Sequence, residues 1–108
     1  MSINVFLDDY RKCPPDHQLV ETIEECFILL STEEIGHLSL DHDLVSKTQN
    51  GFVLVQLMVK HQLFAERITI HSANAGRGKA MYNYLKQAQT DLKMPRSIKV
   101  TLRPLPLH

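Results

Sequence analysis

The 108-residue sequence has no tryptophan, only two cysteines and four glycines, and no excess of charge of either sign. Its longest apolar runs fall far short of the ~20 residues that cross a bilayer. Twelve basic side chains balance twelve acidic ones, so net charge favours neither DNA wrapping nor attraction to a membrane surface. The few aromatic residues leave little for stacking on single-stranded bases. We therefore expect one small domain, residues 1–108, with no membrane and no DNA partner.

The two cysteines, Cys13 and Cys26, have neither a C-x-x-C pattern nor the spacing of zinc ligands. A reducing compartment would leave both as thiols. Met1 is followed almost at once by the apolar run 3–7, without the basic and then apolar stretch of a secretory signal. These features predict a cytoplasmic location.

Strand and helix signals alternate along the chain. Apolar or β-branched runs predict strands at 3–7, 18–21, 35–40, 67–71 and 97–102. Helical stripes follow Thr22, which forms a capping-box pattern with Glu25, then the Asn50-Gly51 pair, and then the turn at 75–78. Strands separated by helices predict a parallel sheet with helices on both faces. The expected fold is a three-layer α/β domain, flavodoxin-like, with five strands in the order 2-1-3-4-5. Pro14 and Pro15 make the first crossover short or degenerate.

Polar side chains follow four of the five predicted strands. The first strand ends at Asp8-Asp9, with Arg11 just beyond, and the last ends at Arg103. The third strand is followed by Asp41-His42-Asp43, and the fourth by His71-Ser72-Ala73-Asn74 with Arg77. Ligands of open parallel sheets bind outside the carboxyl ends of the strands. The sequence thus predicts that these groups share one crevice.

These residue types predict a metal-assisted phosphate site. The metal ligands would be carboxylates, which suit Mg²⁺ or Mn²⁺: Asp8, Asp9, Asp41 and Asp43. Phosphate oxygens would be bound by Arg11, Arg77 and Arg103, with help from Ser72. His42 or His71 would transfer a proton near neutral pH. The predicted catalytic residues are His42, His71, Asp41, Arg77, Arg11, Ser72 and Asn74.

Each of these groups also has an ordinary structural explanation. An Asp pair after a strand is common turn chemistry, and Asp43 could belong to a solvated loop. Ser72 and Asn74 are frequent N-cap residues. A single histidine is more often a structural hydrogen-bonding group than a catalyst, and Arg103 could be a surface residue. The functional interpretation depends on all of these groups lying at the same edge of the sheet.

Several segments together resemble the cyclic-phosphate-processing receiver-like domains found near RNA-repair systems. The resemblance spans roughly residues 3–103 and is carried by three motifs: Leu7-Asp8-Asp9-x-Arg11, Ser39-Leu40-Asp41-His42-Asp43-Leu44 before Gly51, and Ile70-His71-Ser72-Ala73-Asn74 with Gly76-Arg77 and Met81. It implies a receiver-like fold. It also implies a metal-dependent phosphoesterase that acts on cyclic phosphates of RNA ends or nucleotides, so the partner would be an RNA terminus or a phosphate-containing small molecule.

Compared with ordinary response-regulator receivers, Asp8 and Asp9 match the metal-binding acid pair and Asp41 the phosphoacceptor. Arg103 stands where those domains carry lysine, and Ala75 stands where the cyclic-phosphate family is expected to have proline. The first departure argues against phosphorelay signalling. The alternative is a non-catalytic receiver-like module that senses a phosphorylated ligand or docks on a partner protein. A purely structural role would explain the fold but not the polar clustering.

Overall fold

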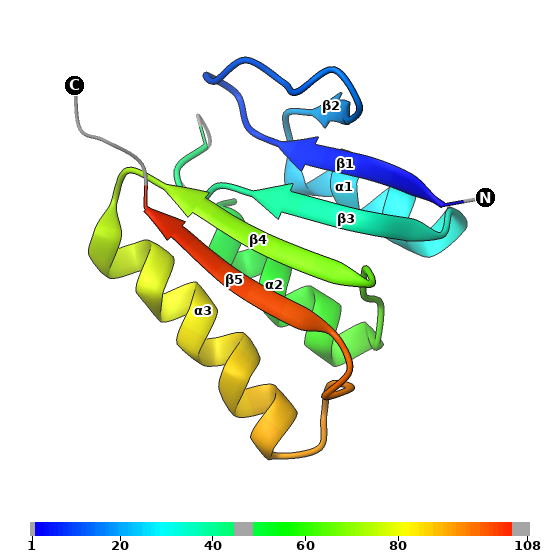
Figure 1. Ribbon diagram of the computed structural model, residues 1–108, viewed down its shortest axis with the longest axis vertical. Coiled ribbons are helices and arrows are strands. Elements are labelled where there is room, and N and C mark those ends of the chain that lie inside the picture. The colour runs from blue at the N-terminus through cyan, green and yellow to red at the C-terminus, as the bar shows by residue number, and fades with distance from the viewer. Residues whose placement is uncertain (1, 45–48, 105–108) are drawn as a thin grey trace.

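The computed structural model describes residues 2–44 and 49–104. Within them a five-stranded, all-parallel sheet has the strand order β2-β1-β3-β4-β5 (Figure 1). Both the parallel sheet and the predicted order are confirmed. In chain order the elements are β1 (Ile3–Leu7), β2 (Gln18–Val20), α1 (Ile23–Thr32), β3 (Ile35–Leu40), α2 (Gly51–His61), β4 (Arg67–Ser72), α3 (Ala75–Thr90) and β5 (Lys99–Pro104).

The helix starts follow the capping signals of the sequence. Thr22 accepts a hydrogen bond from the N–H of Glu25, and Asn50 accepts one from the N–H of Val53. These side chains satisfy amides that have no partner inside the helix. The segment 75–78, expected as a turn, forms the first turn of α3 instead.

The three helices lie in a row on one face of the sheet. α2 packs against both α1 and α3, and Figure 1 shows α1 and α2 behind the strands and α3 alongside β5. The apolar residues of the strands alternate accordingly: Leu38, Leu40, Ile68 and Ile70 point toward the helices and are fully buried. None of the described helices is long and apolar enough to span a membrane.

The expectation of helices on both faces is wrong for the part of the chain that the structure describes. The reason lies in residues 8–17, which join β1 to β2 without a helix. The proline pair, Pro14 and Pro15, lacks backbone donors and disfavours helix before each ring. No described residue forms a helix after β5 either. One face of the sheet is therefore covered only in part, by the loop between β1 and β2.

Gly51 is required where α2 begins close to the end of β3. A Cβ atom at this position would lie 2.2 Å from the carbonyl oxygen of Asp41 and 2.9 Å from the Met81 Cε. The N–H of Gly51 donates to the carbonyl of His42 at 3.0 Å. Because Gly51 has no side chain, the first turn of α2 can pack directly against the loop that carries Asp41 and Asp43.

Candidate functional site

A buried network joins the ends of β1, β3 and β4. Asp8 is fully buried and accepts four hydrogen bonds. Its Oδ1 accepts from the N–H groups of Tyr10 and Arg11 (2.9 and 3.1 Å), and its Oδ2 from His71 Nε2 and Arg11 Nη1 (2.9 and 3.3 Å). The same Nη1 donates to Asp41 Oδ2 at 3.1 Å. The structure thus brings together four of the predicted site residues: Asp8, Arg11, Asp41 and His71.

The pKa values of the two carboxylates in this network are shifted in opposite directions. Burial acts to raise the pKa of Asp8, but the hydrogen bonds from His71 and from the Tyr10 and Arg11 amides outweigh it and hold that pKa well below its ordinary value. The pKa of Asp41 is raised, by burial first and then by the charge of Asp8. Its Oδ1 is buried with no hydrogen-bond donor among the described residues. Asp8 is therefore the firmly ionised member of the pair, and Asp41 the one that ionises less readily.

His71 is held in a defined orientation by groups on both sides of its ring. Nε2 contacts Asp8, and Nδ1 lies 2.7 Å from the hydroxyl of Ser39. Phe6 stacks on the ring, with the two planes 2° apart and the centroids 4.5 Å apart. An ionised Asp8 only accepts, so Nε2 carries the proton and Nδ1 accepts from the Ser39 hydroxyl. The resulting order Ser39–His71–Asp8 is a hydroxyl, a base and an orienting carboxylate.

A cavity of about 420 Å³ opens beside this network on the face of the sheet that has no helix. Its volume is in the range of small-molecule sites. The cavity is basic, and no carboxylate is among its described lining residues. The basic groups and histidines are Arg11, Lys12, Arg103, His17, His37 and His71. This electrostatic character suits a phosphate group, and it brings the predicted Arg103 to the same place as Arg11 and His71.

The remaining predicted residues lie in separate, local arrangements. His42 Nδ1 is 2.7 Å from Asp43 Oδ1, and the exposed Arg77 guanidinium is 3.8 Å from the same oxygen. Asn74 caps α3, since its Oδ1 accepts from the Arg77 N–H, and the Ser72 hydroxyl accepts from the Asn74 N–H. These local hydrogen bonds account for Ser72 and Asn74 without a ligand.

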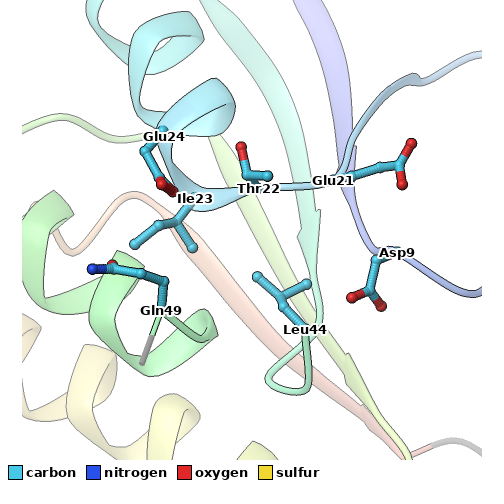
Figure 2. A pocket seen from close by; sticks show the side chains of 7 residues that line it. All are labelled: Asp9, Glu21, Thr22, Ile23, Glu24, Leu44 and Gln49. Atoms are coloured by element: carbon cyan, nitrogen blue, oxygen red, sulfur yellow. The ribbon is translucent and has the colours of Figure 1, made fainter. Parts of the chain in front are cut away.

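Asp9 lines two neighbouring cavities. It shares one, of about 320 Å³, with Arg11, Asp41 and Asp43, and the other has a volume of about 350 Å³. Figure 2 shows Asp9 and Glu21 on one side of Leu44, with Glu24 and Gln49 on the other. Three acidic side chains line this cavity, and its described lining includes no basic one. It is therefore poorly suited to a phosphate.

The resemblance implies a divalent cation, and the described residues hold no ready-made set of ligands for one. They contain no group of three or more potential ligands close enough to share a metal ion. Arg11 bridges Asp8 and Asp41, and Asp43 is engaged by His42. In this arrangement a guanidinium neutralises the acid pair. Mg²⁺ or Mn²⁺ remains a prediction, and no chemical step below is derived through it.

Several residues of the site were not predicted from the sequence. Ser39 orients His71, Phe6 stacks on it, and His17, His37 and Thr69 line the cavity. A signal was present: Ser39 alternates with Leu38 and Leu40, and His71 with Ile70, the period of two that places polar residues on one face of a strand.

The sheet order and the polar network at its carboxyl edge define a receiver-type α/β domain. A family model, the cyclic-phosphate processing receiver domain, matches residues 3–87. The chain belongs to this family. The match ends within α3, so β5 and Arg103 lie outside it. Among curated proteins, none matches the chain.

Proposed function

We propose that this protein is a phosphoesterase that opens cyclic phosphates, either on a nucleotide or at an RNA end, on the helix-free face of its sheet. The observation that carries the proposal is the Ser39–His71–Asp8 chain in the wall of a basic cavity. Membership of a family associated with cyclic-phosphate processing supports it. The cytoplasmic location and a protein partner remain predictions.

The residues of the cavity suggest how the reaction would proceed. Arg11 and Arg103 bind the phosphate oxygens and offset the charge that builds up as the phosphorus is attacked. A water oxygen forms a bond to phosphorus, and its proton passes through the Ser39 hydroxyl to His71 Nδ1. Asp8 stabilises the imidazolium that forms. One ring P–O bond breaks, the released ester oxygen takes up a proton, and a phosphate monoester remains.

Asp41 has an indirect role in this scheme. It accepts from Arg11 at 3.1 Å and so fixes the guanidinium that also contacts Asp8. Loss of this contact would let the phosphate-binding group move. A neutral amide accepts from Arg11 more weakly than a carboxylate does, so an Asp41→Asn variant should lose turnover while it remains folded.

The test is an assay of the purified protein with 2′,3′-cyclic nucleotides and with an RNA oligomer that ends in a cyclic phosphate. Each reaction is run with EDTA, with Mg²⁺ and with Mn²⁺, and ³¹P NMR detects the monoester. We expect turnover, lowered about 10²-fold or more in His71→Gln, since a positioned proton-transfer group contributes about 10²–10⁴-fold. Lys99→Ala changes an exposed residue on the same face, outside the cavity, and should leave the rate unchanged.

Absence of monoester under all three conditions would refute the phosphoesterase proposal and favour a non-catalytic receiver-like module. Turnover in EDTA would refute the predicted metal, whereas turnover only with Mg²⁺ or Mn²⁺ would require Arg11 to leave its position between the acids.

A further inference from the structure

A second chain of hydrogen bonds crosses the floor of the basic cavity. Thr69 Oγ1 lies 2.8 Å from His37 Nε2, and His37 Nδ1 lies 2.8 Å from His17 Nε2. His17 Nδ1 then lies 2.7 Å from Asp16 Oδ1. All four ring nitrogens of the two histidines are engaged. The chain brings together the loop before β2, β3 and β4, and the proposed reaction scheme uses none of it.

The chemistry of its end group sets the direction of the chain. The hydrogen bond from His17 lowers the pKa of Asp16, so this carboxylate is ionised and accepts. His17 Nδ1 therefore donates to Asp16, which leaves His17 Nε2 to accept from His37 Nδ1. His37 Nε2 then accepts from the Thr69 hydroxyl. This direction of the chain holds when each ring carries a single proton. Burial, followed by the charges of Arg67 and His17, lowers the pKa of His37.

The neutral pair lies in a cavity whose other groups favour an anion. The charged and titratable groups that face the pair, from the β1–β2 loop, β4 and β5, are Arg11, Lys12, Asp16, Arg67, His71 and Arg103. Five of these six groups are basic or histidine, which disfavours a further positive charge on the empty cavity. An anion among them reverses that balance, because an opposite charge nearby favours the protonated imidazole. Binding of an anion and uptake of a proton are then linked.

We propose that a phosphate ester bound by Arg11, Lys12 and Arg103 is accompanied by one proton, which the His17–His37 pair takes up. This inference rests on the proposed function for the identity of the ligand, but proton uptake on anion binding does not require turnover. The added proton is shared between two rings whose nitrogens already lie 2.8 Å apart. It is then at hand in the cavity for the ester oxygen that is released when the P–O bond breaks.

The experiment uses sulfate, a divalent anion that does not titrate between pH 5.5 and 8. Calorimetry at pH 7 in two buffers of different protonation enthalpy gives the number of protons taken up per sulfate bound. The wild type should take up about one, and its sulfate affinity should fall about tenfold per pH unit between pH 7 and 8. His17→Asn, a substitution in a loop, and His37→Asn should each take up less than half a proton, with a flattened pH dependence.

His61→Asn is the matched control, because His61 is an exposed histidine of α2 whose ring contacts Phe27, away from the cavity. It should take up as many protons as the wild type. His71→Gln should do so as well, which assigns the proton to the pair rather than to His71. Sulfate binding without proton uptake, no sulfate binding, or wild-type uptake in both His17→Asn and His37→Asn would overturn the inference. Proton uptake without hydrolysis of cyclic phosphates would refute the proposed function alone.

Discussion

Asp8 and Asp41 share one guanidinium, yet replacing Asp8 by asparagine should cost far more stability than the same replacement of Asp41. Asp8 is fully buried and accepts two side-chain hydrogen bonds, from His71 and Arg11, besides two from backbone amides. Hydrogen bonds to a charged group contribute about 1.5–3 kcal/mol each. In Asp8→Asn the imidazole recovers one by changing tautomer, so the free energy of unfolding should fall by about 2–4 kcal/mol.

Asp41→Asn removes a carboxylate whose pKa is raised by burial and by Asp8. The amide oxygen can still accept from Arg11, and the repulsion between the two acids disappears. The free energy of unfolding at pH 7 should therefore change by less than about 1 kcal/mol, or rise.

Urea unfolding of both variants, followed by circular dichroism at pH 7, measures this difference. Equal losses of unfolding free energy in the two variants would refute the assignment of Asp8 as the stabilising anion and of Asp41 as the carboxylate that ionises less readily. A larger loss for Asp41→Asn would reverse it.

Two further perturbations test the same site. The pKa of Asp8 is lowered in the folded state. The stabilisation that its ionised carboxylate gives the fold is therefore fully present above its unfolded pKa of about 3.9, and it is lost as the pH falls toward the folded pKa. Wild-type stability should drop below pH 4, and acid titration followed by circular dichroism should show a shallower drop in Asp8→Asn. Gly51→Ala places a Cβ atom 2.2 Å from the Asp41 carbonyl oxygen and should cost about 1–3 kcal/mol in urea unfolding, whereas Gly76→Ala, with no contact under 3.9 Å, should not destabilise the fold.

The sequence predicted the sheet closely because the strand signals are local. The span 35–40 of β3 matches its observed bounds, and Thr22 and Asn50 cap their helices as their residue types suggest. The strand order followed from the alternation of strands and helices. The gathering of Asp8, Arg11, Asp41 and His71 was predicted on the same basis, since the carboxyl ends of parallel strands meet at one edge.

The helix-free face was not predicted, and for this reason several residues that line the cavity were not predicted either. A parallel sheet is ordinarily covered on both faces, which made the polar residues within strands look incidental. Whether His37 and Thr69 meet depends on the register of β3 against β4, a long-range property that no local pattern contains. The bridging position of Arg11 is equally non-local, because it depends on how the loop after β1 folds back over Asp41.

The register of β3 and β4 makes both hydrogen-bond chains versions of one contact. His37 pairs with Arg67 and bonds the side chain two residues further along β4, which is Thr69. Ser39 pairs with Thr69 and bonds His71, again two residues further along. The diagonal contact thus repeats one pleat along the sheet. A slip of β4 by one residue would turn Thr69 and His71 toward the helices. The alignment of two strands therefore positions both the hydroxyl beside His71 and the histidine pair.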